Sequence, residues 1–255
     1  MLPKKSKIIK IEKENSNTSL LTFDISLKNA SPGQFVMVWL PGVDEKPMSI
    51  AANKPNLQLS IAKLGAVSTK LAESKANDIL YIRGPYGKPF APLGKRWILV
   101  GGGCGFAPLR YLAYYAKENK IYTESIIGAR TADLCMLPAP GKNHITTDDG
   151  SKGVKGNVLV ALEPLLKKEN NWDCVYCCGP EKMMLAVAQM VKKYKIPSQL
   201  SVERYMKCGF GICGHCAMGG WLACKDGPTI TGEEALANSE FGKCYCDKAG
   251  RKKEI

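Results

Sequence analysis

Four cysteines near the carboxyl-terminal end of the chain have a spacing that suits metal chemistry. The segment CGFGICGHCAMGGWLAC places Cys208, Cys213, Cys216 and Cys224 with four, two and seven residues between neighbours. This is the plant-type spacing of the ligands of a [2Fe–2S] cluster, with three close cysteines and a fourth downstream. The glycines between them let the backbone turn tightly and bring amide N–H groups near the sulfurs. We therefore predict that these cysteines hold a [2Fe–2S] cluster.

Other readings of the same loop are weaker but stay open. A structural zinc site usually presents two short cysteine pairs, whereas here three cysteines lie within nine residues. A Rieske centre needs two histidines, and the loop contains only His215, which we expect beside the cluster or at the surface. Cys244 and Cys246 stand outside the four-ligand pattern. Eleven cysteines in a chain that lacks a signal-peptide pattern argue against a disulfide scaffold.

A glycine-rich turn offers a second candidate site. In WILVGGGCGFAPLRYL a buried strand runs through Gly101, Gly102, Gly103 and Gly105 into a helix. A phosphate can approach such a backbone closely and meet the free N–H groups of the helix N-terminus. The segment therefore predicts a nucleotide site, with a tightly packed turn as the alternative.

The segment DCVYCCGPEKMM repeats this arrangement further along the chain. It places Cys178 at the carboxyl end of a strand, and Gly179 and Pro180 open the next helix. Ligands of open α/β sheets bind at the carboxyl ends of strands, so we predict Cys178 as the catalytic residue facing a cofactor. Taken alone, a buried cysteine at a strand end is more often a packing residue than a cofactor contact. Packing is also the role predicted for Cys104, Cys135, Cys174 and Cys177.

A third group of residues lies in the amino-terminal part. The segment EKPMSIA contains Lys46 and Ser49, and IAKLGAVSTKL places Gly65, Ser68 and Thr69 at the start of a short helix. A cation, hydroxyl groups and free helix-end amides are the groups that bind a diphosphate. Taken alone, this signal is weak.

The elements that must position these residues follow from hydrophobic periodicity. Short alternating apolar runs between residues 6 and 82 predict five or six strands of a small antiparallel barrel. After residue 96, strand-like and helix-like segments alternate as in an open parallel α/β sheet. The remaining segment is rich in loops and cysteine. We predict a barrel over 1–95, a nucleotide-binding α/β domain over 96–202 and a cluster module over 203–255.

Composition limits the classes of partner. The net charge is +13, from 36 Lys and Arg against 23 Asp and Glu, but the lysines are scattered along the chain. This pattern favours solvated faces, so we expect no nucleic-acid binding. The sequence has no long apolar run, so we expect no membrane association and a cytoplasmic protein.

In this chain order the three parts resemble the ferredoxin–NADP⁺ reductase superfamily. The segments PGQFVMVWLPGVDEKPMS, GGGCGFAPL, CGPEKMM and ERYMKCGFGICGHC resemble most closely the electron-transfer subunits of NAD-dependent, class 1B dihydroorotate dehydrogenases. The resemblance covers nearly the whole chain. It implies FAD on the barrel, NAD on the α/β domain and a [2Fe–2S] cluster in the last part.

The resemblance also assigns residues. An Arg-Pro-x-Ser segment binds FAD in that superfamily and maps onto Lys46, Pro47, Met48 and Ser49, where lysine keeps the charge of arginine but loses its bidentate fork. Further implied flavin contacts are Ile61, Ala62, Lys63, Gly65, Ser68 and Thr69. The nicotinamide-nucleotide segments match Gly101, Gly102, Gly103, Gly105, Cys178, Gly179 and Pro180.

The function implied is electron transfer in pyrimidine (UMP) biosynthesis. A partner subunit would oxidise dihydroorotate on FMN, and electrons would pass through the cluster and FAD to NAD⁺, in a heterotetramer of two plus two subunits. The seven-residue gap before Cys224 also resembles flavin subunits of hydrogenases and sulfide reductases. The main alternative is therefore an NAD(P)H-linked diaphorase subunit of such an enzyme or of another ferredoxin-linked oxidoreductase.

The sequence leaves two further questions open. A non-enzymatic iron–sulfur redox sensor is a third reading, and it would bind nucleic acid in a salt-sensitive way without FAD. The choice between NAD and NADP is also undecided. Arg130 follows a predicted strand and could meet a 2′-phosphate, stack on adenine or face solvent.

Overall fold

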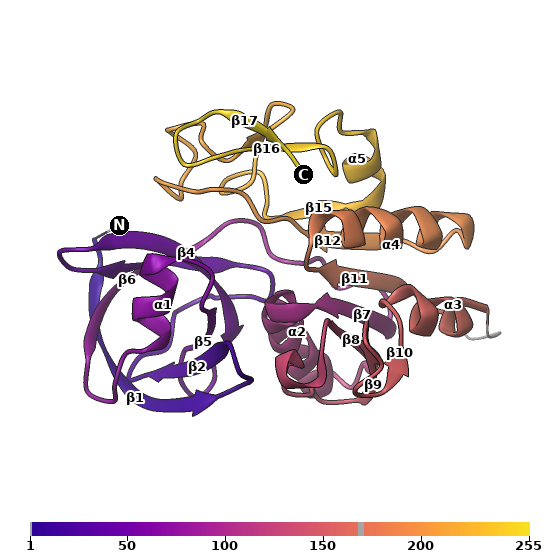
Figure 1. The fold of residues 1–255 in the computed structure, drawn as a ribbon, viewed down its shortest axis with the longest axis horizontal. Coiled ribbons are helices and arrows are strands. Elements are labelled where there is room, and N and C mark those ends of the chain that lie inside the picture. Colours follow the sequence, from indigo (N-terminus) through magenta and orange to yellow (C-terminus); the bar gives the residue numbers. More distant parts are fainter. Residues whose placement is uncertain (1, 168–170) are drawn as a thin grey trace.

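The computed structural model describes residues 2–167 and 171–255. It shows a barrel and an α/β domain side by side, with the carboxyl-terminal part lying across both (Figure 1). None of the helices in the described ranges is long and apolar enough to cross a membrane.

The amino-terminal part is a closed six-stranded barrel, as predicted. Its neighbouring strands are antiparallel and follow the order β1-β2-β5-β4-β3-β6. The strands are β1 (Lys4–Lys13), β2 (Thr18–Phe23), β3 (Phe35–Leu40), β4 (Asp44–Ala52), β5 (Gln58–Ala62) and β6 (Ile79–Tyr86), with helix α1 (Ala66–Ala72) between β5 and β6. Along β3, Val36 and Val38 belong to the barrel core, whereas Phe35 and Met37 pack outside it against the carboxyl-terminal part. This alternation gives the barrel a second, outward apolar surface.

The α/β domain is built on a seven-stranded sheet. Its strands are, in spatial order, β10 (Val154–Lys155), β9 (Lys142–Thr147), β8 (Tyr122–Ala129), β7 (Arg96–Gly102), β11 (Cys174–Cys178), β12 (Ser198–Ser201) and β15 (Thr229–Thr231). The first six are parallel to their neighbours, which confirms the predicted parallel sheet. Only β15 runs antiparallel to its neighbour, β12.

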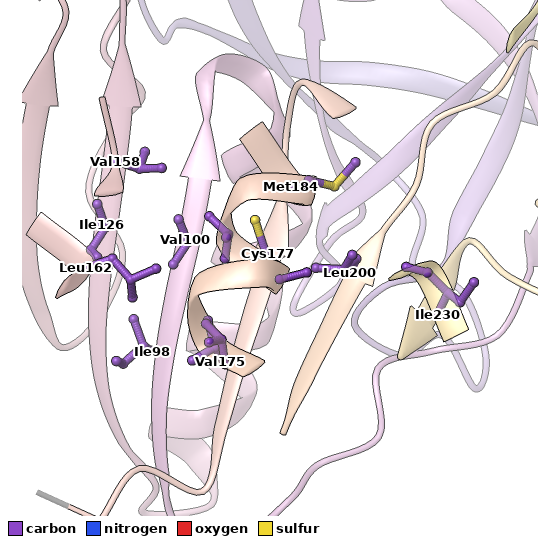
Figure 2. Packing of buried hydrophobic residues seen from close by; sticks show 14 of the residues in the cluster. Ile98, Val100, Ile126, Val158, Leu162, Val175, Cys177, Met184, Leu200 and Ile230 are labelled. Atoms are coloured by element: carbon purple, nitrogen blue, oxygen red, sulfur yellow. The ribbon is translucent and has the colours of Figure 1, made fainter. Parts of the chain in front are cut away.

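Helices cover both faces of this sheet. The short η1 (Gly103–Gly105) leads into α2 (Phe106–Glu118), which packs on one face and shares a core with Ala51 and Phe90 of the amino-terminal part. The other face is covered by α3 (Leu159–Lys167), α4 (Glu181–Lys193) and α5 (Gly232–Ala237). Figure 2 shows this second layer, with Val100, Cys177 and Leu200 of β7, β11 and β12 beside Met184 of α4. The adjacent barrel and sheet therefore have separate cores, and α2 joins them.

The carboxyl-terminal part contributes to the sheet as well as forming its own module. Strand β15 and helix α5 complete the edge of the α/β domain. The rest of this part contains two small hairpins, made of β13 (Ala217–Met218) with β14 (Trp221–Leu222) and of β16 (Cys244–Cys246) with β17 (Lys252–Glu254). The module is thus fixed to the α/β domain by backbone pairing.

The turn between β1 and β2 clamps the barrel to the α/β domain. Glu14 forms an ion pair with Arg110 of α2, and their side chains are 0% and 4% exposed. Burial lowers the pKa of Arg110 to about 10. Next to this pair, Asn15 Nδ2 donates a hydrogen bond to the Leu134 carbonyl at 3.1 Å, and Ser16 Oγ lies 2.7 Å from the Asp133 carboxylate. These contacts hold the two halves of the molecule in one relative position.

The buried ion pair predicts a large stability effect. Replacing Glu14 by Ala leaves the Arg110 guanidinium buried without its counter-charge, and we expect the free energy of unfolding to fall by about 3 kcal/mol or more. Urea unfolding of the purified protein measures the change. As a control, Glu118→Ala removes the exposed pair with Lys54 and is expected to cost less than about 1 kcal/mol. Equal effects of the two substitutions would contradict a clamping role for Glu14.

Candidate cofactor cleft and metal centre

A cleft of about 980 Å³ opens between the barrel, the carboxyl ends of the parallel strands and the carboxyl-terminal part. The barrel side supplies Asn15, Asn17, Thr18, Ala62 and Leu64. The α/β domain supplies Gly102, Gly103, Cys104, Gly105, Gly128, Arg130, Asp148, Gly179 and Pro180, among others. The carboxyl-terminal part supplies Glu203, Tyr205 and the β16–β17 hairpin from Tyr245 to Lys248. The predicted nucleotide segments therefore meet in one cleft, which also reaches the barrel.

The two predicted glycine turns pack backbone against backbone at the floor of this cleft. A Cβ atom added to Gly105 would lie 2.6 Å from the Cα of Gly179. A Cβ added to Gly102 would lie 2.6 Å from Met183 Sδ and 2.9 Å from Pro180 Cδ. Gly103 has a φ of +53° and open space around it. Bare backbone just before the N-terminus of α2 therefore faces the cleft, which is the kind of surface that a phosphate group can approach closely.

Two of the predicted residues lie behind the cleft wall. Cys178 is only 1% exposed, and Gly179 and Pro180 line the cleft in its place. Burial raises the pKa of the Cys178 thiol well above its ordinary value, and the nearby Glu203 carboxylate adds to the effect. Gly101 packs on Phe106, where an added Cβ would lie 2.5 Å from the ring. The catalytic role of Cys178 stays a prediction.

Cys104 and Glu203 line the cleft, although neither is predicted from the sequence to contact a cofactor. Cys104, which we had expected only to pack, is partly exposed, and burial followed by the charge of Glu203 raises its pKa to about 12. The Glu203 side chain is exposed to the cleft, and desolvation by the walls of the cleft raises the pKa of its carboxyl above its ordinary value. Glu203 comes two residues after β12, so the strand-end rule that pointed to Cys178 would have found it.

The predicted flavin residues occupy three different environments. On β4, Lys46 Nζ lies 2.6 Å from the Asp44 carboxylate and 3.4 Å from the Tyr205 hydroxyl. Its amine also stands over the Tyr205 ring, 5.1 Å from the centroid, at the edge of a second cavity of about 600 Å³. The neighbouring Pro47, Met48 and Ser49 are partly buried. Lys46 thus lies where the barrel meets the segment that leads to the cluster loop.

On β5 and α1 the predicted residues are divided between core and surface. Ile61 is fully buried in the barrel and Ala62 lines the large cleft, while Lys63 pairs with Glu73 at 2.8 Å. Ser68 Oγ accepts hydrogen bonds from the Leu64 and Gly65 amides at 3.1 and 3.0 Å. The Ser68 hydroxyl therefore caps its own helix. Thr69 follows it in the first turn of α1, and Gly65 is open to its surroundings.

The four predicted ligands lie in a loop whose amides point at the sulfurs. Gly211 N–H donates to Cys224 Sγ at 3.1 Å, Ile212 N–H to Cys208 Sγ at 3.4 Å, and Cys224 N–H to Cys216 Sγ at 3.4 Å. The loop needs its glycines because Gly209, Gly211 and Gly214 all have φ between +71° and +88°. Burial acts to raise the pKa of Cys208, but amides of the loop outweigh it and lower the pKa to about 6. The backbone thus stabilises thiolate at this position.

The four thiols are arranged as two pairs. The Cys208 side chain interacts with Cys213, and the Cys224 side chain interacts with Cys216. Burial, followed by the neighbouring Cys216, raises the pKa of Cys224 to about 12. Within residues 2–167 and 171–255, no three or more His, Cys, Asp or Glu side chains form a group that could hold one metal ion. Two cysteine pairs suit a two-iron cluster, because each iron takes two protein ligands.

The cluster loop is seated on the outer surface of the barrel. Met37 and Phe35 of β3 form a small core with Met206, Cys216, Ala223 and Cys224. Arg83 Nη2 donates a hydrogen bond to the Cys208 carbonyl at 2.7 Å while its guanidinium is held by Glu45. On the other side His215, predicted not to be a ligand, contacts the Lys248 carbonyl at 3.1 Å. Cys213 is exposed and its partner Cys208 is partly buried, so one of the four thiols lies at the surface.

This combination defines a class of protein, the iron–sulfur flavoprotein reductases. At the level of fold, the chain is similar to the ferredoxin reductase of carbazole 1,9a-dioxygenase, with a TM-score of 0.66, 21% identity and coverage of 76% of this chain and 66% of that one. A nearer structure is a chain of an NADH-dependent reduced ferredoxin–NADP oxidoreductase, with a TM-score of 0.81, 30% identity and coverage of 90% and 88%.

Sequence comparisons identify the family within this class. Residues 203–236 match the model of the iron–sulfur cluster binding domain of dihydroorotate dehydrogenase B. The probable dihydroorotate dehydrogenase B (NAD⁺) electron transfer subunit of Methanocaldococcus jannaschii is 41% identical over 87% of both chains. Its counterpart from Pyrococcus horikoshii is 43% identical over 89% of both chains. The chain therefore belongs to the family of electron transfer subunits of dihydroorotate dehydrogenase B (NAD⁺), which confirms the predicted resemblance.

The ligand assignment predicts which cysteines retain iron. Cys213 is exposed, so Cys213→Ala removes a ligand with little loss of packing, and we expect iron and acid-labile sulfide to fall from about two atoms per chain to near zero. The matched control is Cys246→Ala, which removes a partly exposed cysteine outside the four-ligand pattern and is expected to keep the full iron content. Retention of iron by the Cys213 variant, or its loss from the Cys246 variant, would show that the ligand set is wrong.

Proposed function

We propose that this chain is the electron-transfer subunit of an NAD-linked dihydroorotate dehydrogenase. In this role it carries electrons from an FMN-containing partner subunit, which oxidises dihydroorotate, to NAD⁺ in pyrimidine biosynthesis. When bound, the [2Fe–2S] cluster passes single electrons and FAD pairs them for hydride transfer to NAD⁺. Family membership and the arrangement of the cleft and the cysteine loop support the proposal.

One observation carries the functional argument. Glu203 and Tyr205 line the nucleotide cleft, and Met206 packs with cluster ligands. The first cluster ligand, Cys208, follows two residues later. A single short segment therefore has one end in the cleft and the other at the metal centre. This proximity suits electron exchange between two groups held by the same chain.

The residues of this chain bind the redox groups and shield them from water. They carry out no acid–base chemistry on dihydroorotate. Apolar side chains such as Leu64, Val158 and Met183 line the cleft and limit the access of water to bound groups. The bare backbone of the glycine turns binds phosphate, and the amides of the cysteine loop that point at the sulfurs stabilise thiolate. Proton removal from dihydroorotate is assigned to the partner subunit.

The partner is proposed to approach the exposed end of the cysteine loop. Cys213 lies there, flanked by Phe210 and Ile212, whose side chains are 50% and 78% exposed. Exposed apolar side chains next to a redox centre favour a protein partner at that place. We propose an assembly of two such chains with two catalytic subunits.

A second candidate function is a diaphorase subunit for another ferredoxin-linked oxidoreductase. The similarity to a chain of the NADH-dependent reduced ferredoxin–NADP oxidoreductase favours it, as does the seven-residue spacing before Cys224. Such a subunit would accept electrons from NAD(P)H in the same cleft but would not respond to dihydroorotate.

Reduction of the native complex distinguishes the two functions. We expect that the complex, purified anaerobically from its host, is bleached in the flavin and cluster absorbance bands by dihydroorotate and separately by NADH. The isolated chain serves as the control and is expected to respond to NADH alone, because it lacks the dihydroorotate site. Bleaching of the intact complex by NADH but not by dihydroorotate would contradict the proposal and support the second candidate.

A further inference from the structure

One end of the cleft is formed by two neighbouring parallel strands, β8 and β9. Gly128 of β8 is the register partner of Thr146 of β9, and Arg130 and Asp148 come two residues later on each chain segment. All four residues line the cleft. Arg130 and Asp148 come directly after the last residues of β8 and β9, so both lie at the carboxyl ends of neighbouring parallel strands, where ligands of α/β sheets bind.

Asp148 is free to meet a ligand. Its side chain is exposed to the cleft, and its carboxylate forms no ion pair or hydrogen bond with any residue in 2–167 or 171–255. Its backbone is fixed, because its N–H donates to the Ala129 carbonyl at 3.1 Å. The neighbouring Asp149 differs, since its carboxylate accepts hydrogen bonds from the Ser151 amide and hydroxyl at 2.9 and 2.6 Å and does not line the cleft.

Thr146 gives independent evidence for a polar ligand at this place. It is fully buried and lines the cleft, yet its hydroxyl has no hydrogen-bond partner in the described part of the chain. Buried hydroxyl groups in proteins are almost always hydrogen-bonded, so this one calls for a partner. A Cβ added to Gly128 would lie 3.4 Å from this hydroxyl and 2.4 Å from Val158, so the bare glycine leaves room at the strand end.

Arg130 supplies the opposite charge. It also lines the cleft and forms no ion pair with the described residues. The Asp149 N–H donates to the Arg130 carbonyl at 3.3 Å, so the two charged segments lie next to each other. A guanidinium can stack on an adenine ring or meet a phosphate, whereas a carboxylate accepts hydrogen bonds from hydroxyl groups and repels phosphate. At the 2′ position of an adenosine, the Arg130 guanidinium therefore favours a phosphate group, whereas the Asp148 carboxylate favours a hydroxyl group.

We propose that Asp148 selects NAD(H) over NADP(H) by accepting a hydrogen bond from the 2′-hydroxyl group of the adenosine ribose and repelling a 2′-phosphate. In nucleotide-binding α/β sheets an acidic residue commonly has this role at a strand end, and an arginine has the converse role. Arg130 then contacts the adenine or the diphosphate. The inference rests on the proposed function in one respect, because it requires a nicotinamide dinucleotide in this cleft.

Direct binding of two fragments tests the proposal without the redox reaction. Calorimetric titration of the cofactor-loaded protein compares ADP-ribose with 2′-phospho-ADP-ribose, for wild type, Asp148→Asn and Asp149→Asn. We expect wild type to prefer ADP-ribose and Asp148→Asn to shift the affinity ratio toward the phosphorylated fragment by roughly 10- to 100-fold, because a like charge is removed. Asp149→Asn is the matched control and is expected to leave the ratio unchanged.

The outcomes separate this inference from the proposed function. An unchanged ratio in Asp148→Asn, with iron content and NADH reduction retained, overturns the role of Asp148 and leaves the function intact. A wild-type protein that binds both fragments equally also overturns it. If the ratio shifts as expected but dihydroorotate does not reduce the native complex, the inference stands and the dihydroorotate assignment falls. Failure of both fragments to bind wild type overturns the inference together with the nucleotide role of the cleft.

Discussion

The ion pair between Arg204 and Glu181 is the interaction on which the geometry of the site depends. Both side chains are almost fully buried, and the guanidinium binds both carboxylate oxygens. Glu181 begins α4 directly after the Gly179–Pro180 turn, and its carboxylate also accepts a hydrogen bond from the Gly242 amide at 2.6 Å. Arg204 follows the cleft residue Glu203. The pair therefore links the nucleotide turn, the start of the cluster segment and the carboxyl-terminal hairpin. Separating the three segments would leave a buried charge without its counter-charge, which is energetically costly.

The barrel is held to this unit from two other directions. Glu14 and Arg110 join it to α2, which carries the first glycine turn at its N-terminus. On the opposite side Arg83 joins it to the Cys208 carbonyl, and Met37 packs against the cluster loop. The cleft and the metal loop thus share one rigid set of walls. Charged groups form the clamps at each of these boundaries, while apolar cores fill the interior of each part.

Charge in the cleft is arranged more selectively than the basic composition of the chain suggests. The net charge of +13 comes from lysines scattered over the surface. Inside the cleft, however, Glu203 follows the end of β12 and Asp148 follows the end of β9, and Glu181 and Asp247 line the cleft as well. The cleft of this basic protein therefore contains four acidic side chains, beside the cations of Arg130, Arg204 and Lys248.

The sequence by itself determined the features that depend on neighbouring residues. The cysteine spacing, the glycine turns, the alternating strands of residues 6–82 and the later alternation of strands and helices are all short-range patterns, and they predicted the barrel, the parallel sheet and the cluster loop. The tertiary structure decided which distant segments meet. Only it showed that β15 pairs with β12, that Cys178 lies behind the wall that Gly179 and Pro180 form, and that Cys104 and Glu203 face the cleft. The reason is physical: periodicity and ligand spacing act within a few residues, whereas strand order and the exposure of a strand-end side chain depend on packing between segments far apart in the chain.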